Sequence, residues 1–141
     1  MNIQKLKPFH LAFPVRNLQE TEIWYTNILG CTTQKSDTWI NFNFFGHQMV
    51  LHFSSDIDCI QTNEVDNDEV STRYFALILS PIEWNSLAIN LKSKKINFGI
   101  QPHTRFKDNV GEQYTTFIEE DSNGNFLEFK ALNSDCDIFL K

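Results

Sequence analysis

The chain has 141 residues, 41% of them hydrophobic, which is the size of one ordinary domain with enough apolar side chains to fill a core. Its net charge of -6 argues against nucleic acid as a partner, because nucleic-acid binding depends on Lys and Arg that neutralise phosphates. No stretch is long and apolar enough to cross a bilayer, and the amino-terminal segment lacks the apolar core of a signal peptide. Cys31, Cys59 and Cys136 form no C-x-x-C pair, which favours a reduced setting. We therefore expect a soluble, cytoplasmic protein without membrane or nucleic-acid partners.

The first part of the chain predicts a strand, a helix and three further strands. An apolar run from Phe9 to Val15 is typical of a strand, and Asn17 with Glu20 three residues on is typical of a helix start. Apolar positions at helical spacing continue to Leu29 and stop at Gly30, so we expect a helix over about 18–29. The following strands are expected near 32–35, 38–44 and 48–54, with the last two joined by a turn at 45–47. His47 is interpreted as a residue of that turn rather than a ligand.

The second part repeats the same order of signals. Residues 74–79 form an apolar run, and Ser80-Pro81-Ile82-Glu83 combines an N-cap, a proline at N1 and a glutamate at N3. A helix to about Lys94 is expected, followed by strands near 97–102, 113–119 and 126–131. The last two are joined by the turn-rich segment DSNGN at 121–125.

Short strings support a duplication, because HLAFPV at 10–15 aligns with YFALIL at 74–79, and LHF at 51–53 with LEF at 127–129. The chain is predicted to be a single α+β domain with module one at about 8–54, module two at about 72–132 and a tail at 133–141. Residues 55–71 lack apolar periodicity and are interpreted as an acidic, solvated connector. A calcium loop is disfavoured there, because the D-x-D-x-D-G spacing is absent.

Four polar residues occupy corresponding strands of the two modules: His10 and Tyr74 open the first strands, and His52 and Glu128 lie in the last. Each stands within an apolar stretch, where a polar group without a partner is costly to bury. Alternation along a strand sends their neighbours to the opposite face, under the helices. Those neighbours are Leu51, Phe53, Leu127 and Phe129. Two imidazoles and a carboxylate suit one divalent metal ion, so His10, His52 and Glu128 are the candidate ligands. The alternatives are core histidines and a salt bridge from Glu128 to a cation such as Arg73.

The segment PFHLAFPVRNLQETEIWYTNILG resembles the opening of glyoxalase/bleomycin-resistance/dioxygenase proteins, the vicinal-oxygen-chelate superfamily, and DSNGNFLEFK is similar to its typical ending. The resemblance implies two βαβββ modules in tandem, whose mixed sheets curl around a cavity. His10 and Glu128 match the first and last metal ligands of the family, and His52 matches an additional site of glyoxalase-type members. Tyr74 departs from the pattern, because dioxygenases and fosfomycin-resistance enzymes usually have histidine there. Its phenol is open to four roles: ligand, proton donor, hydrogen bond to substrate, or packing.

A second group of candidates lies in QPHTRFK at 101–107 and GEQ at 111–113, which resemble a segment of one dioxygenase-like branch. His103, Arg105 and Gln113 are expected to bind substrate, with Arg105 or Lys107 facing a carboxylate or enolate. Glu112 is a candidate proton shuttle. The alternative for Lys107 and Glu112 is a charged loop in solvent.

The resemblance implies a small metal-dependent enzyme of dioxygenase or glyoxalase type, acting on a small molecule with vicinal oxygens. Oxygenation favours Fe(II), whereas isomerase or lyase chemistry is compatible with Zn, Ni, Mn or Co. Two other classes stay open: a metal-free binding protein like those of the bleomycin-resistance branch, and an accessory protein that keeps only the scaffold. By analogy with the family, the chain is expected to form a homodimer.

Overall fold

The structure, a computed structural model, describes residues 7–56, 62–71, 74–109, 112–120 and 125–133. The chain divides into two compact units, residues 1–58 and 59–141. Several sequence-based expectations lie outside the described residues: Cys59, Cys136, Arg73, the turn at 121–124 and most of the tail. Neither helix of the described part is long and apolar enough to span a membrane.

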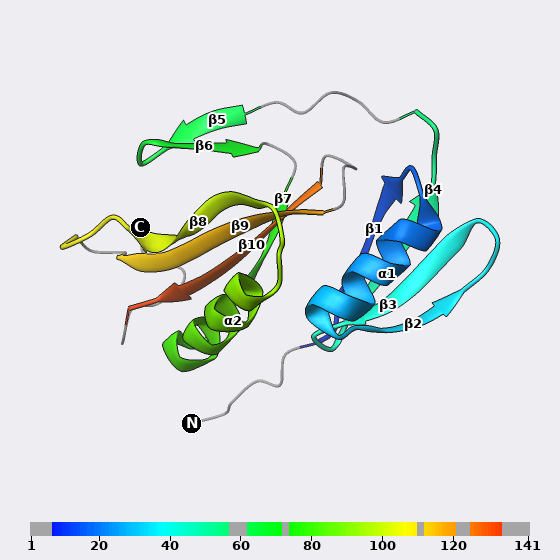
Figure 1. Ribbon diagram of the computed structural model, residues 1–141, viewed down its shortest axis with the longest axis horizontal. Helices are drawn as coiled ribbons and strands as arrows, with labels where there is room; N and C mark the ends of the chain where they lie inside the picture. Colours follow the sequence, from blue (N-terminus) through cyan, green and yellow to red (C-terminus); the bar gives the residue numbers. More distant parts are fainter. Residues whose placement is uncertain (1–6, 57–61, 72–73, 110–111, 121–124, 134–141) are drawn as a thin grey trace. The chain divides into compact units, whose positions relative to one another are not determined.

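The first unit is one βαβββ module. Its elements are β1 (His10–Val15), α1 (Leu18–Leu29), β2 (Thr32–Lys35), β3 (Trp39–Phe44) and β4 (His47–Phe53). The sheet order is β1-β4-β3-β2, with β1 parallel to β4 and the other pairs antiparallel (Figure 1). Helix α1 begins where predicted, because the Asn17 side chain accepts a hydrogen bond from the Glu20 amide at 3.0 Å. It ends at Gly30, whose φ of 68° is in the left-handed region that favours glycine.

The second unit contains the other module with the same connectivity. Its elements are β7 (Tyr74–Ile78), α2 (Pro81–Ser93), β8 (Phe98–Arg105), β9 (Gln113–Glu120) and β10 (Asn125–Leu132). The order β7-β10-β9-β8 repeats that of the first sheet, again with its first pair parallel. Ser80 and Glu83 form the predicted capping box at the start of α2. The prediction of two tandem βαβββ modules is therefore confirmed, and β8 runs three residues beyond its expected end at 102.

The connector is not the solvated loop that its acidic composition predicted. Residues 62–71 form an antiparallel hairpin of β5 (Thr62–Val65) and β6 (Asp68–Ser71) within the second unit (Figure 1). Its two turn residues, Asp66 and Asn67, have φ of 46° and 66°, which is the conformation of a tight type I′ hairpin turn. The acidic composition of this segment predicted a loop, but Asp and Asn are also the residues that a tight hairpin turn prefers.

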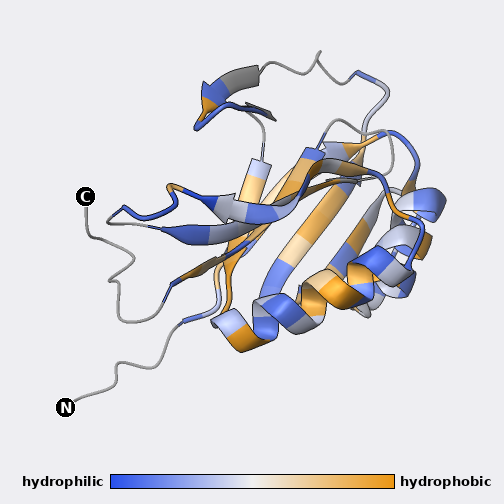
Figure 2. Ribbon diagram, turned by 60° about the vertical axis from the view of Figure 1, so that its left-hand side comes forward, coloured by the Kyte–Doolittle hydropathy of each residue, from blue (hydrophilic) through white to orange (hydrophobic). Residues whose placement is uncertain are grey.

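Each sheet packs one face against its helix, and the second sheet also buries Phe117 and Arg105 on its other face. Figure 2 shows both hydrophobic and hydrophilic residues along the strands. Leu51, Leu127 and Phe129 are at most 1% exposed, which confirms that the neighbours of His52 and Glu128 point to the buried side. Phe53, at the end of β4, is the exception with 55% exposure. Other large buried side chains include Tyr25, Ile40, Phe42, Met49, Leu91 and Ile118.

Candidate functional site

In the first sheet, His10 and His52 share the face opposite the core. Residue pairing places His10 beside Gln48 and Pro14 beside His52, and a shift of an even number of residues keeps side chains on one face. Both histidines line a recess of about 310 Å³. Its other lining residues are Trp39, Asn41, Gln48 and Val50. The first unit therefore brings the two predicted histidine ligands to one surface.

The imidazole of His10 is held by a neighbouring side chain of β4. Its Nδ1 lies 2.7 Å from Oε1 of Gln48, an amide oxygen that can only accept a hydrogen bond. This contact with Gln48 orients the imidazole ring of His10. Metal-binding histidines are typically oriented in this way, by a hydrogen bond from the second ring nitrogen to an oxygen. The donor set at His10 fits a divalent ion.

His52 lies farther along the sheet than its alignment with Glu128 predicted. In the second module Ala76 pairs with Glu128, whereas the corresponding Ala12 pairs with Val50. By strand register, the counterpart of Glu128 is thus Val50, and the expected equivalence with His52 is wrong by two residues. The sequence could not reveal this difference in register, because a shift of two residues leaves every side chain of the strand on the same face of the sheet. His10 pairs with Gln48, and His52 lies four residues beyond Gln48 on β4, which is about 13 Å along the strand. To bind one ion together, the two imidazole side chains must therefore point toward each other along the sheet.

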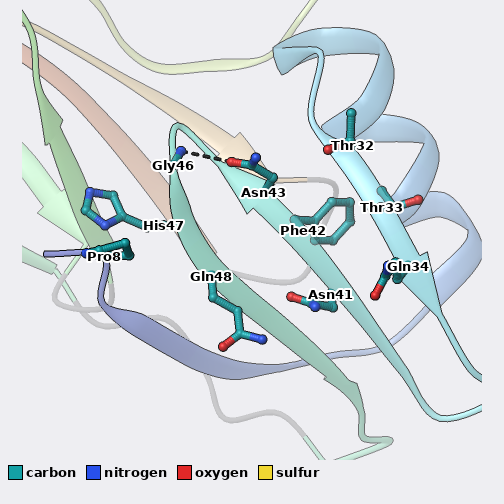
Figure 3. A pocket seen from close by; sticks show the side chains of 10 residues that line it. All are labelled: Pro8, Thr32, Thr33, Gln34, Asn41, Phe42, Asn43, Gly46, His47 and Gln48. Carbon is teal, nitrogen blue, oxygen red and sulfur yellow. Dashed lines mark hydrogen bonds between the residues drawn. The ribbon is translucent and has the colours of Figure 1, made fainter.

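A second, more polar recess of about 530 Å³ lies on the same unit (Figure 3). Several of its side chains have structural partners. Asn43 accepts a hydrogen bond from the Gly46 amide at 2.9 Å, and His47 Nδ1 accepts one from the Phe9 amide at 3.2 Å. These bonds hold the turn between β3 and β4, which agrees with the interpretation of His47 as a structural residue. Buried Oδ1 of Asn41, which lines both recesses, has no hydrogen-bond partner among the described residues.

The second sheet collects most of the remaining candidates on one face. Strand pairing aligns Ala76 with Glu128, Glu128 with Phe117, His103 with Thr115 and Arg105 with Gln113. Alternation then places five predicted residues on one face, the face opposite Leu127 and Phe129. They are Tyr74, His103, Arg105, Gln113 and Glu128. The second sheet therefore brings these five residues to one face.

Glu128 is the most buried of these candidates, with 2% of its surface exposed. Its Oε1 accepts a hydrogen bond from the Thr115 hydroxyl at 2.9 Å and lies 3.7 Å from Nη1 of Arg105. The second distance is too long for a hydrogen bond, although the opposite charges attract. The alternative of an arginine near Glu128 is thus realised, with Arg105 in the place proposed for Arg73.

Arg105 is itself buried, at 3% exposure, and its closest partner was not predicted. Nη2 of Arg105 lies 2.8 Å from Oδ2 of Asp68, a residue of the β5–β6 hairpin. The same carboxylate oxygen lies 3.1 Å from Nε2 of His103, while Nδ1 of His103 bonds the carbonyl of Gln101 at 2.8 Å. Sequence reasoning missed Asp68 because it treated the hairpin as loop. The Asp66-Asn67 turn was the available signal.

Tyr74 keeps a protonated phenol at neutral pH. Burial and the nearby negative charge of Glu128 raise the pKa of Tyr74, and the positive charge of Arg105 opposes this only in part. The ring is 46% exposed and meets Phe117 edge-on, with centroids 5.1 Å apart. A protonated phenol suits hydrogen-bond or proton donation better than direct metal ligation.

Glu112 lies outside this face, in the loop before β9. Its carboxylate accepts hydrogen bonds from the Asp108 amide at 2.7 Å and from the Asn133 side chain. The hydrogen bond from the Asp108 amide and that from Asn133 lower the pKa of Glu112 and keep it ionised. A role in proton transfer stays a prediction, and the structure adds a role in closing the loop.

Neither a protein-family model nor a curated protein matches the sequence. Among solved structures, a glyoxalase/bleomycin resistance protein/dioxygenase from Alicyclobacillus acidocaldarius is similar to the chain at 30% identity and a TM-score of 0.77. The match covers 94% of this chain and 96% of the other. The chain belongs to the glyoxalase/bleomycin resistance/dioxygenase family.

More distant solved structures share the fold. The fosfomycin resistance protein FosX from Listeria monocytogenes has a TM-score of 0.63 at 15% identity, covering 94% of this chain and 97% of its own. Lactoylglutathione lyase from Agrobacterium tumefaciens has the same score and identity, covering 92% and 96%. These similarities agree with the tandem βαβββ fold, and the 30% identity to the Alicyclobacillus acidocaldarius protein confirms the predicted family. Within either unit, no three described His, Cys, Asp or Glu side chains form a ready metal cluster.

Proposed function

We propose that this protein is a small metal-dependent enzyme of dioxygenase or glyoxalase type, acting on a small molecule with vicinal oxygens. The observation that carries the proposal is Glu128, a carboxylate with 2% exposure that lies 3.7 Å from the guanidinium of Arg105. A buried carboxylate with so loose an ion pair is suited to a stronger cationic partner. His10 supports the proposal, because Gln48 orients its ring and leaves Nε2 to bind.

The proposed ligands are His10, His52 and Glu128. A divalent ion bound to them supplies Lewis-acid polarisation of neighbouring substrate oxygens. Fe(II) suits oxygenation, and Zn, Ni, Mn or Co suits isomerase or lyase chemistry. His52 lies four residues along β4 from the level of His10, so its variant is the most informative of the three.

The other residues on the face of Glu128 would bind and orient the substrate. Tyr74 donates a hydrogen bond or a proton from its protonated phenol to a substrate oxygen. Arg105, with an unpartnered buried Nε among the described residues, attracts negative charge that develops on the substrate. His103 and Gln113 flank it on the same face and fix orientation. Glu112 is the candidate proton acceptor.

Metal analysis of protein purified without a histidine tag tests the proposal. We expect close to one divalent ion per chain, and loss of that ion in His10→Ala, His52→Ala and Glu128→Gln variants that still fold. His47→Ala is the matched control, because this histidine lies on the same sheet but bonds the Phe9 amide. Metal-free protein, or unchanged metal content in all three variants, would support the rival class of metal-free binding proteins.

Two further expectations belong to the proposal. A cytoplasmic location agrees with the absence of C-x-x-C pairs in the sequence. A homodimer is the expected assembly, and light scattering of the purified chain should give twice the mass of 16.5 kDa.

A further inference from the structure

The buried guanidinium of Arg105 lies between two carboxylates and bonds only one of them. Its Nη2 is 2.8 Å from Oδ2 of Asp68, within the range of a charge-assisted hydrogen bond. Its Nη1 is 3.7 Å from Oε1 of Glu128, beyond that range. Arg105 therefore prefers Asp68, although Glu128 is the more buried carboxylate.

Asp68 can form this hydrogen bond with Arg105 because the β5–β6 hairpin is fixed to this sheet at several points. Val65 packs against Ile100 and Phe117, and the Phe106 amide donates to Oδ2 of Asp66 at 3.0 Å. His103 adds a second contact to Asp68, at 3.1 Å. These contacts hold the Asp68 carboxylate next to a guanidinium that is 3% exposed.

Without Asp68, Glu128 would be the natural partner of Arg105. A guanidinium presents a planar fork of N–H donors that matches a carboxylate, and a buried charge without a partner is costly. Closing 3.7 Å to hydrogen-bond distance requires a small movement of one side chain. A close Arg105–Glu128 pair would occupy the carboxylate oxygens that a metal ion needs.

We propose that Asp68 is a positioning residue, which holds the Arg105 guanidinium away from Glu128 and so keeps that carboxylate free to bind a divalent cation. This inference rests on the proposed function, because it assumes that Glu128 is a metal ligand. It gives the acidic hairpin between the modules a role in the site. Asp68 acts through Arg105 and does not bind the ion itself.

Titration of Co²⁺ into metal-depleted full-length protein, followed by calorimetry, tests the inference. Asp68→Asn should weaken Co²⁺ binding about 10- to 100-fold, the usual effect of losing a residue that orients a ligand. Asp66→Asn is the matched control, because it removes the same charge from the same hairpin and leaves the guanidinium contact intact. It should bind Co²⁺ as the wild type does.

Two rescue variants separate positioning from general damage. Asp68→Glu restores a carboxylate beside Arg105 and should recover most of the affinity. Asp68→Asn combined with Arg105→Gln should also recover it, since no guanidinium is then left to pair with Glu128. A purely structural role of Asp68 predicts no recovery in the double variant.

The outcomes distinguish this inference from the proposed function. If His10→Ala and Glu128→Gln weaken Co²⁺ binding but Asp68→Asn does not, the inference alone is overturned. It is also overturned if Asp66→Asn and Asp68→Asn weaken binding equally, because the effect is then one of charge or hairpin stability. If Glu128→Gln leaves Co²⁺ binding unchanged, the proposed metal site itself fails.

Discussion

The indole Nε1 of Trp84, on α2, donates a buried hydrogen bond of 2.8 Å to the carbonyl oxygen of Phe129, on β10. This bond joins the helix of the second module to the strand that carries Glu128, one residue away. The ring of Trp84 also stacks on Tyr114, with centroids 5.3 Å apart. The helix thus fixes the strand from the core side, while Glu128 points to the other face.

Trp84→Phe should lower the free energy of unfolding by about 1–3 kcal/mol, because it removes the buried donor while keeping an aromatic ring. Urea denaturation followed by circular dichroism measures this. Trp24→Phe on α1 is the control, since the contact of that ring is with Tyr25. Equal losses in the two variants would mean that ring size rather than the hydrogen bond matters.

The capping box of α2 gives a second prediction. Ser80→Ala removes the side chain that accepts from the Glu83 amide and should cost about 1 kcal/mol of unfolding free energy. Ser93→Ala, near the other end of the same helix, is expected to change stability less, because its hydroxyl bonds a carbonyl of its own helix. A larger loss at Ser93 than at Ser80 would contradict the assignment of the N-terminal cap.

The same cap predicts a pH dependence. Glu83 accepts a hydrogen bond from the Ser80 amide, which lowers the pKa of Glu83 below its ordinary value of 4.5. A carboxyl with a depressed pKa in the folded state stabilises the protein above its ordinary pKa, and this is lost as pH falls through the folded pKa. Wild type should therefore exceed Glu83→Gln in stability at pH 6, and the difference should shrink toward pH 3. A difference that does not change with pH would rule out the charged form as its source.

Cys31 should resist chemical modification in the folded protein. It is a buried free cysteine, and burial raises the pKa of its thiol to about 11. The thiolate is the reactive form, so little of it exists near neutral pH. Peptide mapping by mass spectrometry after iodoacetamide treatment should find Cys31 unmodified in native protein and modified in urea. Rapid native labelling would show that this part of the first module opens.

Gly99 allows a close approach between β8 and a side chain of β10. A Cβ at this position would lie 2.7 Å from Cε1 of Phe126, closer than real contacts allow. Gly99→Ala should therefore destabilise the second module by about 1–3 kcal/mol through overpacking. Combining it with Phe126→Leu should recover part of the loss. Full stability of the single variant would show that Phe126 moves freely.

The parts of the fold that depend on neighbouring residues could be predicted from the sequence. Asn17, Gly30 and the Ser80–Glu83 pair set the helix ends within a few residues, and strand alternation placed Glu128 on the face opposite Leu127 and Phe129. Contacts that depend on pairing of distant segments could not. Asp68 and Arg105 are 37 residues apart, and no local pattern joins them. The register of His52 was also missed, because a slip of two residues leaves the hydrophobic pattern unchanged.

Anomalous diffraction from crystals of the protein grown with Co²⁺ would locate the proposed metal site. We expect one strong peak at about 2.0–2.2 Å from His10 Nε2 and a carboxylate oxygen of Glu128, with His52 as the third protein ligand. A peak bound by other residues, or Co²⁺ without contact to either His10 or Glu128, would contradict the proposal.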